Sequence, residues 1–207
     1  MLEKIQYKKE LLLLFVVHLA GIIGIKSMYS DFFLQLSFIS LLIPLFIVVF
    51  RMKIAPKSFF LLIAVYGFGF FAEWLGVNGG YVFGDYIYGN SLGYKVGGVP
   101  LLIGVNWLLL TIVSREIALK YFSSPLAIVF SAASIMLAID IVIEPIAHKL
   151  DFWTWNGNSI PLSNYRDWFF IAIVNQFIFL FLKSQYKVFG LALGYVIILV
   201  LFFCFFY

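Results

Sequence analysis

The sequence predicts an all-α protein, a polytopic bundle of about seven transmembrane helices. Hydrophobic residues make up 64% of the 207 residues and charged residues only 12%, a balance that soluble domains do not show. Apolar runs close to the roughly 20 residues that a helix needs to cross a bilayer recur along the whole chain. We therefore expect one integral membrane domain over residues 1–207, in contact with membrane lipids.

Charged residues or clusters of Gly, Pro and Asn separate the apolar runs and so define the predicted spans. The seven expected spans are Leu11 to Ile25, Phe32 to Phe50, Ser58 to Val77, Val99 to Ser114, Ser124 to Glu144, Trp168 to Leu182 and Val188 to Tyr207. The first and sixth are short, so flanking lysines would have to lie along the lipid and reach water with their ammonium groups.

The distribution of Lys and Arg predicts the orientation. Most of them lie in the N-terminal segment and in the second, fourth and sixth loops, and the cytoplasmic side of a membrane protein carries the excess of these residues. We expect the N-terminus inside and the C-terminus outside, in the cytoplasmic membrane of a bacterium or archaeon. The two long loops, residues 78–98 and 146–167, then lie on the outer side.

Composition also limits the ligand. The net charge of +4 is spread over short loops and is not gathered in a patch, which argues against a nucleic-acid partner. The single cysteine, Cys204, and two distant histidines lack metal-site spacing, so we predict no metal and expect His18 to pack between helices. Aromatic residues make up 20% of the chain, and a cavity walled by them would suit an apolar ligand.

The same order of features occurs twice, which predicts an internal repeat. Each copy has an acid near the end of a span, an aromatic-x-aromatic segment in the long loop, and a Pro-Leu with a Trp seven residues after the proline. The copies are Glu73, Tyr86, Tyr88, Pro100 and Trp107, and Glu144, Trp153, Trp155, Pro161 and Trp168. The units would cover about residues 58–119 and 124–183, with spans 3–4 matching spans 5–6. They would be parallel, related by an axis along the membrane normal, with a shared site between them. Coincidence in an aromatic-rich chain is the alternative.

Three acids lie inside otherwise apolar spans: Glu73, Asp140 and Glu144. An ionised carboxylate costs several kcal/mol in the bilayer, so these side chains must face protein or water and are candidates for function. Asp140 and Glu144 are four residues apart and therefore share one helix face. Two carboxyl groups in one apolar site favour a state in which one of them holds a proton. The structural alternative is that the acids only hydrogen-bond neighbouring spans.

Further polar and aromatic residues surround these acids in the sequence. Asn106 and Asn164 are expected to converge with them and to position water. Asp85 is an additional acid candidate, although a turn cap is the favoured interpretation for Asp85 and Asp151. Ring faces that could stabilise a cation, by about 0.5 to 2 kcal/mol each, come from Tyr86, Tyr88, Trp107, Trp153, Trp155 and Trp168. Singly, the tryptophans also fit the interpretation of interfacial anchors.

Two motif blocks over residues 73–168 resemble membrane carotenoid biosynthesis proteins of the CruF type. The first block runs from Glu73 through Phe83-Gly84-Asp85-Tyr86-Ile87-Tyr88, Leu92-Gly93 and Gly98-Val99-Pro100 to Trp107. The second is Asp140-x-x-x-Glu144-Pro145-x-Ala147, Trp153-x-Trp155, Pro161-x-x-Asn164 and Trp168. Asp151-Phe152 before the Trp-x-Trp departs from the small residue expected there.

The resemblance implies a carotenoid 1′,2′-hydratase. Such an enzyme hydrates the terminal ψ-end double bond of an acyclic or monocyclic carotene to a tertiary alcohol, with water as co-substrate and without a cofactor. The implied catalytic residues are Glu73, Asp140 and Glu144. The implied substrate-binding residues are Phe83, Tyr86, Tyr88, Asn106, Trp107, Trp153, Trp155, Asn164 and Trp168. Other enzymes of the carotenoid pathway are the expected protein partners.

Three other functions stay open. A weaker similarity to membrane lycopene cyclase domains suggests a cyclase, but those domains carry a glutamate pair after the proline, where this chain has Leu101-Leu102 and Leu162-Ser163. A small transporter with a carboxylate proton relay would need a polar path through the bilayer, and we expect the inner halves of the spans to be nearly featureless. A purely structural membrane protein is the third alternative.

Overall fold

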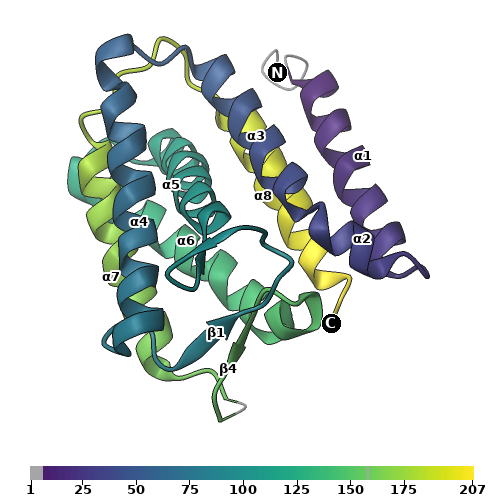
Figure 1. The fold of residues 1–207 in the computed structure, drawn as a ribbon. Coiled ribbons are helices and arrows are strands. Elements are labelled where there is room, and N and C mark those ends of the chain that lie inside the picture. Colours follow the sequence, from purple (N-terminus) through teal and green to yellow (C-terminus); the bar gives the residue numbers. More distant parts are fainter. Residues whose placement is uncertain (1–6, 158) are drawn as a thin grey trace.

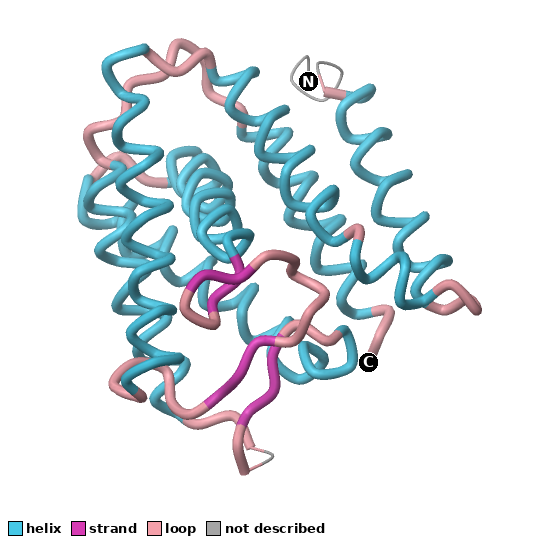
Figure 2. The backbone as a smooth tube through the Cα atoms, in the orientation of Figure 1, coloured by secondary structure: helices cyan, strands magenta, loops and turns pink. Residues whose placement is uncertain are grey.

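The computed structural model describes residues 7–157 and 159–207 and is mostly helical (Figures 1 and 2). The α-helices are α1 (Lys8–Ile25), α2 (Ser30–Gln35), α3 (Ser37–Met52), α4 (Phe59–Gly79), α5 (Leu101–Tyr121), α6 (Pro125–Ala147), α7 (Leu162–Phe179) and α8 (Phe189–Cys204). Short 3-10 helices, η2 (Pro56–Ser58) and η3 (His148–Leu150), precede α4 and follow α6. Every predicted span contains a helix.

Among the described residues, four helical segments are long and apolar enough to cross a membrane. They are Ser30–Met52, Pro56–Gly79, Leu101–Tyr121 and Pro125–Leu150. The other predicted spans are shorter or more polar: α8 has 16 residues, α1 opens on Lys8-Lys9-Glu10, and α7 carries five polar or charged side chains after Ser163. The protein is thus a membrane protein with four candidate spans, and seven complete crossings stay a prediction.

Two predicted helix boundaries differ from the structure. The second predicted span is broken at Leu36, where the Ser37 hydroxyl donates to the Leu34 carbonyl at 2.6 Å and competes with helical hydrogen bonding. The sixth was expected to begin at Trp168, yet α7 begins directly after Pro161, whose extended backbone (φ −74°, ψ 147°) opens the helix. Asn164 therefore lies on α7, one turn before Trp168.

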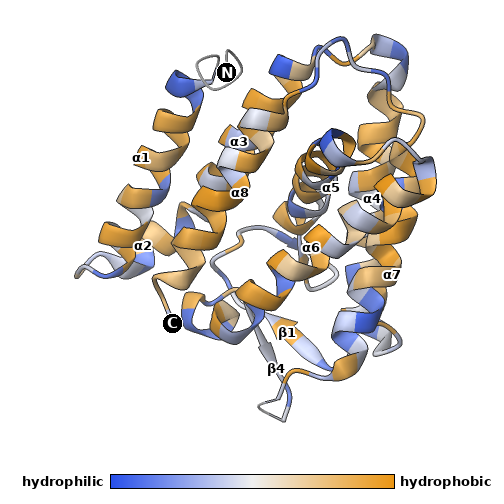
Figure 3. Ribbon diagram, turned by 180° about the vertical axis from the view of Figure 1, so that it is seen from behind, coloured by the Kyte–Doolittle hydropathy of each residue, from blue (hydrophilic) through white to orange (hydrophobic). Residues whose placement is uncertain are grey.

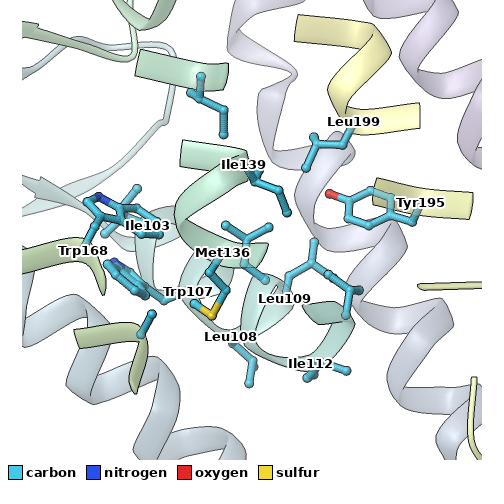
Figure 4. Close-up of a cluster of buried hydrophobic side chains, with 14 of the residues drawn as sticks. Ile103, Trp107, Leu108, Leu109, Ile112, Met136, Ile139, Trp168, Tyr195 and Leu199 are labelled. Atoms are coloured by element: carbon cyan, nitrogen blue, oxygen red, sulfur yellow. The ribbon is translucent and has the colours of Figure 1, made fainter. Parts of the chain in front are cut away.

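Helix α5 is the centre of the bundle. It packs against α3, α4, α6 and α8, and Figure 1 shows it between α4 on one side and α3 with α8 on the other. Consecutive residues from Trp107 to Ala118 are all buried, as expected for a helix surrounded by others. Figure 4 shows the core next to it, where the ring of Trp168 lies over that of Trp107 and Met136 lies beside Trp107.

The outer faces of the bundle are apolar. Figure 3 shows hydrophobic residues along most of the helix surfaces, with polar residues gathered near helix ends and loops. Large side chains on these faces are more than half exposed, for example Phe46 (70%), Phe60 (63%) and Phe170 (66%). Water would not favour such a surface, whereas lipid chains would cover it.

The two long loops form strands that an all-α class does not include. Strand β1 (Tyr86–Tyr88) pairs antiparallel with β4 (Trp153–Trp155), in the register Tyr86↔Trp155 and Tyr88↔Trp153. Strand β2 (Lys95–Val96) pairs with β3 (Val99–Pro100) around Gly97-Gly98, both of which have positive φ as this tight turn requires. The β1–β4 pair joins the two loops at one end of the bundle (Figure 2).

Candidate functional site

Glu73 lies at the loop end of α4 and is 3% exposed. Its Oε2 accepts hydrogen bonds from the hydroxyls of Tyr86 (2.6 Å) and Tyr88 (2.7 Å), and its Oε1 accepts one from the Trp107 indole Nε1 (2.9 Å). The alternation of side chains along β1 turns both phenols to the same face, toward this carboxyl group. Burial, together with the neighbouring carboxylate of Glu73, raises the pKa of Tyr86 and Tyr88, so both remain hydrogen-bond donors.

Glu144 has an equivalent set of donors at the loop end of α6. Its Oε2 accepts from the indoles of Trp153 (3.2 Å) and Trp155 (2.8 Å), the two inward-facing residues of β4. Its Oε1 accepts from the Asn164 amide at 2.7 Å. The predicted pairing of each acid with its own aromatic-x-aromatic segment is thus present as hydrogen bonds.

Asp140 lies one helical turn before Glu144 and is 1% exposed. Asn164 connects the two acids, because its amide nitrogen also lies 3.4 Å from Asp140 Oδ2. Asp140 Oδ1 has no hydrogen-bond partner among the described residues. Of the three acids, Asp140 alone has an oxygen that receives no hydrogen bond from the described part of the chain.

Both glutamates line one small pocket between the two halves of the site. The pocket has a volume of about 10 Å³, close to what a single water molecule needs. Aromatic rings make up most of the rest of the wall, together with Asn164 and one aliphatic side chain; these residues are Phe83, Tyr86, Tyr88, Ile103, Trp153, Trp155, Asn164 and Trp168. At its α5–α7 side, Trp107 and Trp168 stack with ring centroids 3.9 Å apart and planes at 20°.

A family model described as "Carotenoid biosynthesis protein" matches residues 31–207. The chain belongs to this family. The matched region contains all three acids, the β1–β4 strands and α3 to α8, and therefore the whole of the pocket. Comparison with curated proteins and with solved structures gave no match.

In this carotenoid biosynthesis protein, a second and apolar cavity adjoins the acid pocket. The two cavities share Ile103 and Trp153 as walls. The apolar cavity continues between α1, α3 and α8, and its other lining residues are His18, Ser37, Ser40, Leu41, Leu92, Leu102, Asn106, Ile143, Phe152, Leu199, Phe202 and Phe203. Its lining is mostly hydrophobic, as a hydrocarbon ligand requires.

The structure does not bring Asn106 to the acids. Asn106 precedes Trp107 by one residue, which turns it about 100° around α5 and into the apolar cavity. Asp85 is exposed and outside the pocket, with its carbonyl accepting from the Asn156 N–H. Asp151 is a turn cap, as predicted, because its Oδ2 accepts from the backbone N–H groups of Asn90 and Ser91 and from the Ser91 hydroxyl.

The loop around Phe83 is held in a strained conformation by residues that the sequence did not single out. Phe83 has a positive φ of 67°, which is rare for a bulky residue. Its N–H donates to Asp167 (2.9 Å), and its carbonyl accepts from the Ser163 hydroxyl (2.8 Å). Both partners lie in the first turns of α7, so that helix fixes the position of the Phe83 ring in the pocket wall.

The expectation of featureless inner halves is wrong for α5 and α7. Buried polar residues occupy the halves of these helices remote from the loops: Thr111, Ser114, Arg115, Glu116, Asn175 and Gln176. Gln176 donates to the Thr111 carbonyl at 3.0 Å, and Glu116 accepts from the Val188 N–H at 2.8 Å. Hydropathy of single spans missed them because α5 is covered by protein on all sides and does not face lipid.

The position of His18 agrees with its prediction. His18 packs edge-on against Tyr195 and Phe202, as expected, although its Nδ1 bonds within its own helix to the Leu14 carbonyl at 2.8 Å. In the part of the chain that the structure describes, no three His, Cys, Asp or Glu side chains gather as metal ligands would.

Proposed function

We propose that the protein hydrates the terminal ψ-end double bond of an acyclic or monocyclic carotene. The observation that carries this proposal is that the acid pocket and the apolar cavity adjoin, with Trp153 and Ile103 as shared walls. On one side lies a pocket for about one water molecule with Glu73 and Glu144 in its wall, and on the other an apolar cavity. The reaction needs both environments, because one reactant is water and the other is a hydrocarbon.

The Asp140–Glu144 pair is the proposed source of the proton. The two carboxyl groups share the amide of Asn164, and one proton held between them removes the repulsion of two buried negative charges. Glu144 lines the pocket and is therefore the group that meets the alkene. Transfer of its proton to the less substituted carbon breaks the π bond and leaves a tertiary cation on the other carbon.

Water then completes the reaction without a cofactor. A lone pair of the water oxygen forms the new C–O bond with the cation, and the proton that this oxygen loses returns to the Glu144 carboxylate. The net change is the addition of one water molecule to the carotene, and the acid pair is restored. General acid–base catalysis of this kind contributes typically a factor of about 10² to 10⁴.

Glu73, on the opposite wall from Glu144, and the aromatic rings around the pocket stabilise the cation. The two oxygens of Glu73 are held by three donors, which fixes its position. Ring faces of Trp153, Trp155 and Trp168 border the same small space. Each ring can stabilise a desolvated cation by about 0.5 to 2 kcal/mol.

The arrangement of the two halves supports the proposed repeat. Strands β1 and β4 are equivalent segments of the repeat and pair antiparallel about the equivalent residues Ile87 and Thr154, and Trp107 stacks on its equivalent, Trp168. A two-fold axis between the halves, along the membrane normal, would produce these contacts. We further propose the orientation that Lys and Arg predict, with the site near the outer face; labelling of Cys204 with a membrane-impermeant thiol reagent in intact cells tests it.

Expression in a host that accumulates the acyclic carotene tests the function. The wild-type chain should produce a pigment heavier than the substrate by one water, and Glu73→Gln, Asp140→Asn and Glu144→Gln should each lose it while the protein still accumulates in membranes. Asp85→Asn is the matched control, because this acid is exposed outside the pocket and should leave the alcohol unchanged.

The product mass separates the alternatives. A modified pigment with the mass of the substrate would identify a cyclase and contradict hydration. Unchanged pigment with the wild-type chain would favour a transporter or structural protein. Full alcohol formation in all three acid variants would remove the acids from the mechanism.

A further inference from the structure

A third cavity lies against the loop side of Glu144. It has a volume of about 480 Å³, and its walls come from the end of α6, from β4 and from the segment before α7. The lining residues of this cavity, called the vestibule below, are Glu144, Pro145, His148, Trp153, Thr154, Trp155, Ser159 and Ile160. At about 30 Å³ per water molecule, this volume has room for on the order of ten or more waters.

Glu144 and two indoles separate the vestibule from the acid pocket. Glu144, Trp153 and Trp155 line both spaces, so the same carboxyl group borders each of them. Trp153 also lines the apolar cavity and is the one residue named here that borders all three. Its Nε1 donates to Glu144 Oε2 at 3.2 Å, which holds the ring beside the acid.

The vestibule and the apolar cavity differ in polarity, as water and a carotene do. The vestibule presents the polar and exposed side chains of His148, Thr154 and Ser159. The apolar cavity presents mainly Leu, Ile and Phe side chains. Water partitions into the first and a polyene into the second, so the cavities would keep the reactants apart until they reach Glu144.

We propose that the vestibule is the water-access site of the enzyme and that the Trp153–Glu144 pair is the partition at which water meets the carotene. This inference rests on the proposed hydration. The water that adds to the cation comes from the vestibule side of Glu144, and the proton that it loses passes to the same carboxylate. Separate access also limits the number of waters at the cation, because only about one fits in the acid pocket.

A chemical plug tests the proposal on folded protein. Cys204 is the only cysteine, so the background is Cys204→Ser, and Ser159→Cys places one thiol in the vestibule. Purified protein is treated with a bulky N-substituted maleimide or with a reagent that adds only a methylthio group, and the extent of labelling is measured by mass spectrometry. The matched control is Ile87→Cys, which is 60% exposed, pairs with Thr154 in the β1–β4 ladder and does not line the vestibule.

The bulky label on Ser159→Cys should lower alcohol formation at least about tenfold and leave the KM for the carotene unchanged, because water access is lost and polyene binding is not. The methylthio label should have little effect, and neither label should affect Ile87→Cys. Complete labelling of Ser159→Cys without loss of activity, or failure of this thiol to react, would overturn the proposal. Absence of alcohol from the unlabelled protein would instead contradict hydration itself.

Discussion

Glu73 and Glu144 occupy matching places at the loop ends of α4 and α6, but their partners differ. Two phenols and one indole donate to Glu73, whereas two indoles and one amide donate to Glu144. Each acid is therefore held by three donors. Of the two glutamates, only Glu144 lines the vestibule among the described residues, so the proposed access of water is at this end of the site.

A second difference lies one helical turn before each glutamate. Helix α6 has Asp140 there, and α4 has Gly69, where an added Cβ would lie 2.4 Å from the Trp107 ring. The indole that donates to Glu73 thus occupies the space that a second acid would need. The two halves also differ three residues after the proline. Ile103 follows Pro100 at this spacing, whereas Asn164 follows Pro161.

We propose that the two ends of the site have different tasks in the reaction. The Glu144 end has a carboxyl pair and a connecting amide, which suit proton transfer, and it borders the vestibule, the proposed route for water. The Glu73 end has one fixed carboxyl group among aromatic rings, which suits electrostatic stabilisation of a cation.

The largest effect is expected from Glu144→Gln compared with Glu73→Gln. Glu144→Gln removes the group that gives and regains the proton and should lower the rate of alcohol formation about a thousandfold, against about a hundredfold for Glu73→Gln. Initial rates in membrane vesicles supplied with the carotene measure both. Equal rates for the two variants, or a larger loss with Glu73→Gln, would break the assignment of roles.

Asn164→Leu should have the next largest effect. It removes the donor that Asp140 and Glu144 share, and leaves Asp140 with no hydrogen-bond partner among those described. We expect a loss of stability of about 1 to 3 kcal/mol together with a clear fall in alcohol formation. Thermal unfolding in detergent and the vesicle rate are measured side by side.

The matched control for Asn164→Leu is Ile103→Leu, the corresponding position of the other half. It keeps the pocket apolar there and should stay close to wild type in rate, because no hydrogen bond is lost. Asn164→Leu with a wild-type rate would show that the carboxyl pair acts without its connecting amide.

Much of the fold and of the site could be predicted from the sequence. Apolar runs predicted the helices, because length and hydropathy are properties of each segment alone. The sequence also indicates the intramembrane acids and the aromatic-x-aromatic segments, since an acid in an apolar run is costly unless it is partnered. Family membership agrees with the motif resemblance, whereas the hydratase subtype stays a proposal.

The remaining features depend on tertiary contacts that no single segment encodes. The β1–β4 pairing joins loops about 65 residues apart, and two three-residue strands have little local signal. Asn106 turns away from the acids because helix geometry places neighbours on different faces. Arg115 and Gln176 are buried because α5 is the central helix, which hydropathy cannot reveal.

A smaller effect, dependent on pH, is expected from the phenols of the Glu73 end. Burial raises the pKa of Tyr86 and Tyr88 above the ordinary tyrosine value of about 10. A raised folded-state pKa means that the protonated phenol stabilises the fold below about pH 10, and that this contribution is lost as pH rises through the folded-state value. Stability should therefore fall above about pH 10.

Tyr86→Phe and Tyr88→Phe test this dependence. Each variant loses a hydrogen bond to the Glu73 carboxylate and should be less stable than wild type at neutral pH by about 1.5 to 3 kcal/mol. Each should also lose less stability than wild type between neutral and alkaline pH. Unfolding in detergent at several pH values gives both quantities. A wild-type alkaline slope in both variants would show that these phenols are not the titrating groups.

The smallest effects are expected from the two loop aspartates, and they mark the limit of the acid site. Asp151→Ala removes the acceptor for Asn90 and Ser91 and should cost about 1 kcal/mol, since a turn cap is lost. Asp85→Ala removes an exposed side chain and should leave the rate within about twofold of wild type. Chemical unfolding and the vesicle rate are measured for both. Because Asp151 supports the loop that carries β4, its variant should lose stability with little change in rate per folded molecule. A large loss of rate at either position would mean that a loop aspartate takes part in the reaction. The chemistry would then not be restricted to Glu73, Asp140 and Glu144.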